Sequence, residues 1–203
     1  MIRCLSALWL LALACTSLAQ GVLEHPVQSD AQRERLKVIA AKLKESLPVQ
    51  AQMEQRKHLS VLHEPMVSTG EFSLSAAGNM RWHIAEPFAV TYRVEGERIE
   101  REIEGERELI TASSEPSVYG FFQVFSRLFE LDLASLERHF TVYLAPEAES
   151  GRWDIALQPT GAPLNRLVAL VLVAGQAGHI DKVTVTEPGD DYTELLFSYP
   201  ERD

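Results

Sequence analysis

The sequence predicts a single α+β domain in which one long antiparallel sheet is interrupted by a phenylalanine-rich helix. Apolar and polar residues alternate with a period of two across residues 72–94, which is typical of strands with one apolar face. Residues 29–46 and 113–131 instead repeat apolar residues every three or four positions, as amphipathic helices do. After residue 139, glycine and proline separate further apolar segments at the spacing of an antiparallel meander. These patterns together favour an α+β fold.

The first expected element is a helix that Ser29 or Asp30 can cap. Its apolar positions follow helical spacing: Leu36, Ile39, Ala40, Leu43 and Leu47. Pro48 ends this helix, because proline cannot continue the hydrogen-bond ladder. A first strand is expected over residues 49–61.

Three strands follow, and their shared face carries a tryptophan and a tyrosine. Gly78-Asn79 and Glu95-Gly96 stand where hairpin turns are needed. The apolar positions of this face are Phe72, Leu74, Ala76, Met80, Trp82, Ile84, Phe88, Val90, Tyr92 and Val94. The face must pack against either an ordinary core or a ligand. The charged run that follows keeps the alternation at Ile99 and Ile103, so we expect exposed strands there as well.

The second helix is expected over residues 113–131, with Ser114 as a cap and Pro116 in its first turn. One face is strongly aromatic: Val118, Phe121, Phe122, Phe125, Leu128 and Phe129. This face has two interpretations, a plain core contact or a lid over an apolar hollow. Residues 133–139 either prolong this helix or form a short one of their own.

The remainder returns to strands, and residues 167–175 are expected to be buried on both faces because the run is continuously apolar. The expected segments are 140–146, 152–159, 164–175, 179–188 and 193–200. A strongly curled sheet of this length can enclose more space than its own side chains fill.

The N-terminus is typical of a secretory signal peptide. Arg3 precedes an apolar run of about a dozen residues, and Ser17-Leu18-Ala19 favours cleavage after Ala19. We therefore expect a signal peptide over residues 1–19, a mature domain over 20–203, and export to a bacterial periplasm. The alternative is a lipoprotein acylated at Cys15, although Leu13 is bulky for such a site.

Composition excludes several classes of function. Both cysteines, Cys4 and Cys15, lie in the expected signal peptide, so the mature chain has neither a thiol nucleophile nor a cysteine metal site. Loss of Arg3 makes the formal net charge one unit more negative than the −10 of the whole chain. This balance argues against binding nucleic acid or anionic lipid surfaces by charge.

The sequence shows no specific catalytic or metal-binding pattern, and we expect no enzyme activity, metal or cofactor. The histidines form no H-x-x-x-H or H-E-x-x-H pair, and neither G-x-S-x-G nor S-x-x-K occurs. The acidic residues 187–194 do not have EF-hand spacing and fit a hairpin turn better. An envelope hydrolase using His83 or His139 remains an alternative without a nucleophile constellation.

The order of short motifs resembles the periplasmic outer-membrane lipoprotein carrier family, LolA and its relatives, as a divergent subgroup. The motifs are "MEQ" (residues 53–55), "GEF" (70–72), "RW" (81–82), Pro87, "EG" (95–96) and the closing "KVTVTEPGDDYTELLFSYP". This resemblance implies an incomplete antiparallel β-barrel of about eleven strands, closed by helices. It also implies a monomeric carrier that shields acyl chains of a lipoprotein or other lipid between an inner-membrane donor and an outer-membrane acceptor.

The resemblance also suggests the site. It implies a lipid-binding lining of Phe72, Leu74, Met80, Trp82, Ile84, Val90 and Tyr92, with Phe121, Phe122, Phe125 and Phe129 as the lid. The family's lid-tethering arginine falls at Ala76 here, and Arg81 lies on the opposite strand face. An alternative is a sensor or scaffold of the same fold that binds a protein partner along Arg98–Arg107.

Overall fold

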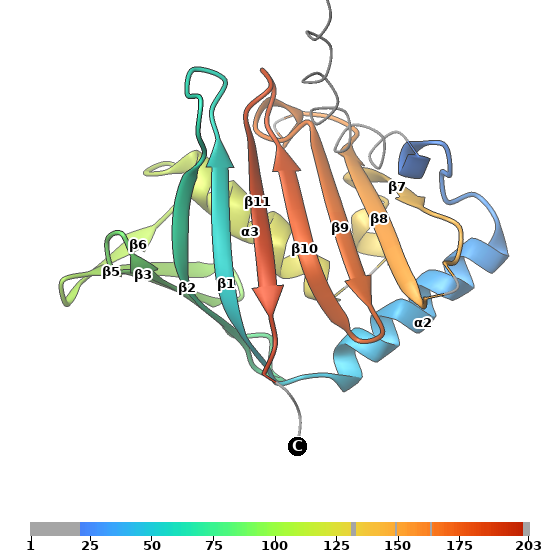
Figure 1. The fold of residues 1–203 in the computed structure, drawn as a ribbon, viewed down its shortest axis with the longest axis horizontal. Helices are drawn as coiled ribbons and strands as arrows, with labels where there is room; N and C mark the ends of the chain where they lie inside the picture. The colour runs from blue at the N-terminus through green and yellow to red at the C-terminus, as the bar shows by residue number, and fades with distance from the viewer. Residues whose placement is uncertain (1–20, 131–132, 149, 163, 201–203) are drawn as a thin grey trace, which may run out of the picture.

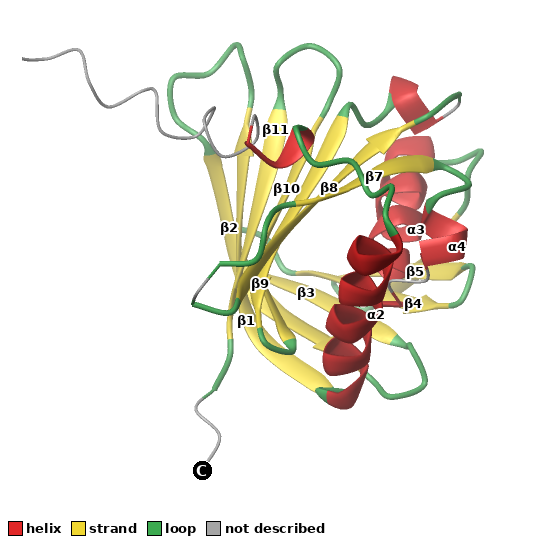
Figure 2. Cartoon of the chain, turned by 90° about the vertical axis from the view of Figure 1, so that its right-hand side faces the viewer, coloured by secondary structure: helices red, strands yellow, loops and turns green. Residues whose placement is uncertain are grey.

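The computed structural model describes residues 21–130, 133–148, 150–162 and 164–200 of the 203-residue chain. The expected signal peptide, with Cys15, therefore lies outside the described residues. Within them, eleven antiparallel strands form one sheet that curls around the helices (Figures 1 and 2). The strands are β1 (Val49–His58), β2 (Met66–Leu74), β3 (Met80–Glu86), β4 (Val90–Glu95), β5 (Arg98–Ile103), β6 (Glu106–Ile110), β7 (Phe140–Leu144), β8 (Arg152–Pro159), β9 (Leu170–Gln176), β10 (His179–Thr186) and β11 (Tyr192–Ser198).

The strand order explains how the sheet curls without closing. It runs β6-β5-β4-β3-β2-β1-β11-β10-β9-β8-β7, so paired strands are consecutive in the chain except for β1 and β11. That pairing joins two meanders, and their outer strands, β6 and β7, do not pair with each other. The predicted open antiparallel barrel of about eleven strands closed by helices is confirmed.

The helices lie on the concave side, between the two ends of the sheet (Figure 2). They are α2 (Asp30–Glu45), α3 (Pro116–Glu130) and α4 (Leu133–Leu136), with a 3-10 turn, η1, at Leu164–Arg166. The segment after α3 thus forms a separate short helix, which was one of the two expected outcomes.

A capping box at Ser29 explains why α2 begins at Asp30. The Ser29 hydroxyl accepts a hydrogen bond from the Gln32 amide at 3.3 Å, and the Gln32 side chain accepts one from the Ser29 amide at 3.0 Å. This capping box satisfies donors that the helix itself leaves free. Leu36, Ile39 and Leu43 then bury the apolar stripe that their spacing predicts.

One expectation about the sheet was wrong. Residues 167–175 do not form a strand buried on both faces: η1 occupies 164–166, and β9 begins only at Leu170. Within β9, burial alternates: Val171, Val173 and Gly175 are buried, whereas Leu170, Leu172 and Ala174 are only half-buried. The run is continuously apolar because the second face of β9 is also partly covered. The sequence pattern alone cannot distinguish such partial cover from full burial.

Candidate functional site

A cavity of about 360 Å³ lies between α3 and the concave face of the sheet. Helix α3 contributes one wall, while β9, β10 and the segment before β9 contribute the other. The apolar lining consists of Phe121, Phe125, Leu128, Leu167, Val168, Val171, Val185 and Pro188. A volume of this size lies within the range of small-molecule sites in proteins, which begins at about 300 Å³.

The aromatic face of α3 also rests on a tryptophan from β3. The Trp82 ring centroid lies 5.1 Å from that of Phe125, 5.6 Å from Phe121 and 5.9 Å from Phe122, all edge-to-face. Phe72 on β2 meets Phe125 in the same geometry, at 5.8 Å. Such pairs are favourable beyond their buried area. These contacts pack α3 against β2 and β3, in the N-terminal half of the sheet.

The structure separates the predicted site residues into two groups. Phe121 and Phe125, from the predicted lid, line the cavity, whereas Phe122 packs against Trp82 and Tyr92. The side chain of Phe129 lies outside the described residues. The predicted lining from β2, β3 and β4 lies beside the cavity and contributes no residue to its described walls: Phe72, Leu74, Met80 and Trp82 are buried, and Ile84, Val90 and Tyr92 are half-buried.

Sequence reasoning missed the second wall. Val171 and Val185 occupy concave positions of β9 and β10, and their alternation with Leu170 and Thr186 was visible in the sequence. Nothing in a period-two pattern, however, says which strands face α3. Only the β1–β11 pairing, which joins the two meanders, places β9 and β10 opposite the helix.

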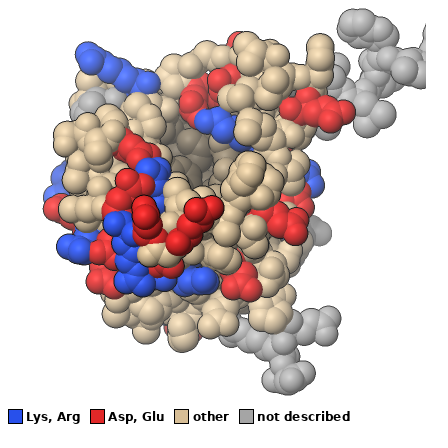
Figure 3. Space-filling view, turned by 90° about the vertical axis from the view of Figure 1, so that its left-hand side faces the viewer, with Lys and Arg blue, Asp and Glu red and all other residues tan. Residues whose placement is uncertain are grey.

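The mouth of the cavity carries charged residues from three segments. Lys57 at the end of β1, Glu187 after β10 and Arg166 in η1 all line it, together with Ser117 and Thr193. The Lys57 ammonium lies 3.4 Å from the Glu187 carboxylate. The end of β1 and the β10–β11 turn stand at the same end of the sheet (Figure 1). Figure 3 shows a recess whose edge carries both basic and acidic side chains.

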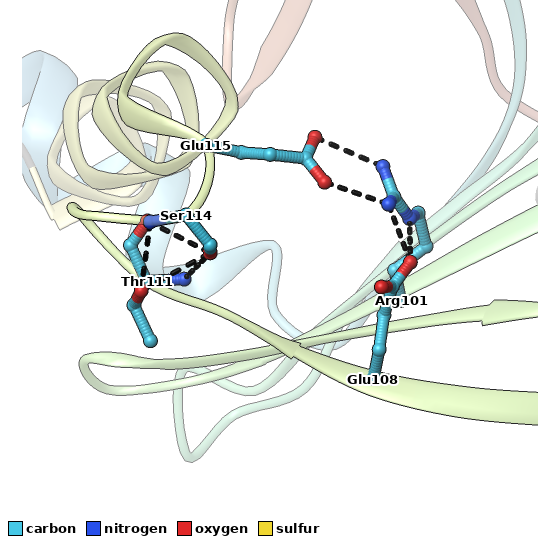
Figure 4. A network of polar contacts seen from close by, with 5 residues as sticks. All are labelled: Arg101, Glu108, Thr111, Ser114 and Glu115. Carbon is cyan, nitrogen blue, oxygen red and sulfur yellow. Dashed lines mark hydrogen bonds and ion pairs between the residues drawn. The ribbon is translucent and has the colours of Figure 1, made fainter.

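An ion-pair network ties the beginning of α3 to β5. Arg101 lies on the concave face, where its guanidinium pairs with Glu115 at 2.6 Å and donates to Glu108 at 2.5 Å (Figure 4). Burial lowers the pKa of Arg101, but interactions with Glu108, Tyr92 and Glu115 outweigh this and raise it. Thr111 and Ser114 bond each other's amides at 3.0 and 3.1 Å and order the turn before the helix.

This network bears on how α3 is held to the sheet, because Ala76 occupies the position of the lid-tethering arginine in the family that the sequence resembles. Ala76 is exposed in the turn between β2 and β3, so it cannot hold the helix. Arg81 points to the convex face, where its guanidinium lies 3.7 Å from Glu71. Arg101 is thus the arginine that connects α3 to the sheet among the described residues.

Apart from the Arg101–Glu115 pair, the ion pairs described for the charged segment Arg98–Arg107 lie within the sheet. Glu102 accepts hydrogen bonds from Arg93 at 2.7 Å and from Arg107 at 2.8 Å, and these bonds lower the pKa of its carboxyl group. Arg98 pairs with Glu100. Figure 3 shows basic and acidic side chains intermingled on the side of the molecule where Figure 1 places β5 and β6.

In the part of the chain that the structure describes, no group of three or more histidine, cysteine, aspartate or glutamate residues is placed to hold a metal ion. Over the same residues, no helix combines the length and the apolar character needed to span a membrane.

Comparisons with known proteins concern the fold. No protein-family model matches the sequence, and no curated protein shows significant sequence similarity to it. Among solved structures, a LolA superfamily protein from Nitrosomonas europaea is 11% identical with a TM-score of 0.45, over 83% of this chain and 94% of that one. The lipoprotein LppX from Mycobacterium tuberculosis is 14% identical with a TM-score of 0.44, over 86% and 98%.

A third structure is a complex of two proteins, MucA and MucB, from Pseudomonas aeruginosa. It is 13% identical with a TM-score of 0.39, over 86% of this chain and 60% of the matched chain. All three TM-scores lie below 0.5, so these likenesses add nothing about ligand or partner to what the cavity itself shows. The chain itself has the fold of an open antiparallel barrel with helices on its concave face. A LolA superfamily protein is among the solved structures to which it is similar.

Proposed function

We propose that this protein is a periplasmic carrier that shields the acyl chain of a lipoprotein or other lipid and delivers it towards the outer membrane. The observation that carries this proposal is the apolar cavity of about 360 Å³ between α3 and the β9–β10 face. Apolar walls on both sides suit a hydrocarbon chain, because burial of each methylene contributes about 0.8 kcal/mol.

The physical chemistry of the cavity suits a carrier. Hydrophobic binding is non-directional, so a chain can slide in and out without a chemical step. Transfer then requires only that the acceptor bind the cargo more tightly than the donor does. Neither a nucleotide nor a metal is needed, and the predicted signal peptide over residues 1–19 fits a periplasmic route.

Helix α3 has the position of a lid. It supplies Phe121, Phe125 and Leu128 to the cavity, and it covers Trp82. In this proposal, outward movement of α3 enlarges the cavity and turns Trp82 and its neighbours Phe72 and Met80 into lining. The half-buried residues Ile84, Val90 and Tyr92 then extend the apolar surface along β3 and β4.

A cavity-filling substitution tests the proposal. Val185→Phe should block the cavity while keeping an apolar residue on β10, so the mature protein should lose at least tenfold in affinity for a fluorescent fatty acid. The matched control is Val61→Phe, at a position that is 84% exposed, and it should bind as the wild type does. Equal binding by both variants, or no binding by the wild type, would contradict a carrier function.

A further inference from the structure

The mouth of the cavity combines an apolar interior with two basic side chains. Lys57 approaches from β1 and Arg166 from η1, segments far apart in the chain. Among the described residues, the ammonium of Lys57 forms an ion pair with Glu187 at 3.4 Å. Arg166 is exposed, and no carboxylate in the described ranges lies within ion-pair distance of its guanidinium. A basic mouth above an apolar interior is complementary to an amphiphile with an anionic head.

We propose that the cavity binds a single-chain anionic amphiphile, with its headgroup between Lys57 and Arg166 and its tail against α3. This inference rests on the proposed function and narrows it to a class of ligand. The shared chemistry is a carboxylate or phosphate head on one acyl chain.

The volume favours one chain. Sites for drug-sized ligands run from about 300 to 1,000 Å³, so a cavity of about 360 Å³ lies near the lower end of that range. With α3 in its present position, such a space suits one acyl chain better than several chains together.

The Lys57–Glu187 pair is suited to exchange. Both side chains are 40% exposed, and ion pairs with such exposure contribute little to stability because water and salt screen them. A ligand anion can therefore replace Glu187 at low cost, and charge-assisted hydrogen bonds to Lys57 and Arg166 are stronger than neutral ones. The hydroxyl groups of Ser117 and Thr193 line the same mouth and can donate to the headgroup.

Carboxylates near the mouth, Glu187 and Asp191, repel an anionic headgroup unless the two basic side chains offset their charge. Asp191 has a lowered pKa because the Ser60 amide donates to it at 2.7 Å and, to a smaller extent, because the charge of Lys57 reaches it. The chain as a whole carries a formal net charge of −10, which repels anions from most of its surface. Lys57 and Arg166 therefore supply a local attraction, and removing them should expose the ligand head to repulsion by Glu187 and Asp191.

The test compares decanoate, decyl phosphate and decanol, which differ only in the headgroup. Calorimetric titration of the mature protein should show that Lys57→Gln combined with Arg166→Gln weakens binding of at least one anionic ligand about tenfold. Decanol should stay within twofold of the wild type. The larger loss between decanoate and decyl phosphate identifies the head as carboxylate or phosphate. Glu187→Gln should strengthen binding of the anions two- to threefold.

The control pair is Lys37→Gln with Arg98→Gln, two exposed cations that each pair with one glutamate elsewhere on the surface. This control should leave all three affinities unchanged. If the Lys57→Gln, Arg166→Gln variant bound all three ligands more weakly by the same factor, or bound all three as the wild type does, the headgroup assignment would be overturned. The proposed carrier function would still stand, with a neutral chain as cargo. If the wild type bound none of the three, the proposed function would fail together with the headgroup assignment.

Discussion

The Arg101 guanidinium lies 2.6 Å from the carboxylate of Glu115, and this ion pair joins β5 to the residue directly before α3 (Figure 4). Arg101 also holds Glu108 on the neighbouring strand β6. The side chain of Arg101 is 20% exposed, against 33% for Arg93 and 61% for Arg98, so its guanidinium is better shielded from water than those of the neighbouring arginines. The lid helix is therefore tied to the sheet at its N-terminal end.

Replacing Arg101 by glutamine should loosen α3. Glu108 and Glu115 would lose their shared cation, and a hydrogen bond to a charged group contributes about 1.5–3 kcal/mol. We expect the free energy of unfolding, measured by urea denaturation, to fall by about that amount, and the amides of α3 to exchange faster with deuterium. Arg98→Gln, on an exposed pair, should change stability by less than about 0.5 kcal/mol. Equal effects of the two substitutions would contradict a special role for Arg101.

Trp82→Ala should be among the most destabilising single changes. The indole is 2% exposed and meets three phenylalanines of α3, so its removal leaves a large void. Losses of about 3–5 kcal/mol are typical of such truncations. Thermal unfolding measures the effect, and Phe88→Ala provides the control because Phe88 is 79% exposed. A stable Trp82→Ala protein would mean that α3 does not rest on this ring.

The acid dependence of stability should depend in part on Glu194. Burial alone would raise the pKa of this carboxyl group, but hydrogen bonds and charge from Lys182 and His58 outweigh it and lower the pKa below the ordinary 4.5. A carboxyl with a lowered folded-state pKa contributes stability above its unfolded value and loses it as the pH falls through the folded value.

Glu194→Gln should therefore destabilise the protein at pH 7 and have a smaller effect at pH 3. Urea denaturation at pH 3, 5 and 7 measures the difference. Asp30→Asn, on the exposed first turn of α2, serves as the comparison. A difference between wild type and Glu194→Gln that stays constant across these pH values would contradict this account.

Much of the fold could be predicted from the sequence because the relevant forces act locally. Leu36, Ile39 and Leu43 face the core because one helical turn separates them, and Phe72 and Leu74 share a face because strands alternate. The same alternation places Arg101 on the inner face with Ile99, so the signal for the lid contact was present within the charged run.

The candidate site could be predicted only in part, because it depends on long-range pairing. The resemblance to the carrier family implied that Phe121 and Phe125 belong to a lid, and both line the cavity. Lys57 and Arg166 line one cavity because β1 pairs with β11, which brings the two meanders together. No local pattern encodes that pairing.

The most direct test of the central claim is native mass spectrometry of the mature protein, purified from periplasm without detergent and followed by organic extraction. The account predicts a fraction of the protein with the added mass of one acyl-chain compound, which Val185→Phe removes without unfolding the chain. A uniformly empty wild-type protein that also fails to take up a fluorescent fatty acid would contradict it. The charged edge Arg98–Arg107 would then be the surface to test for a protein partner.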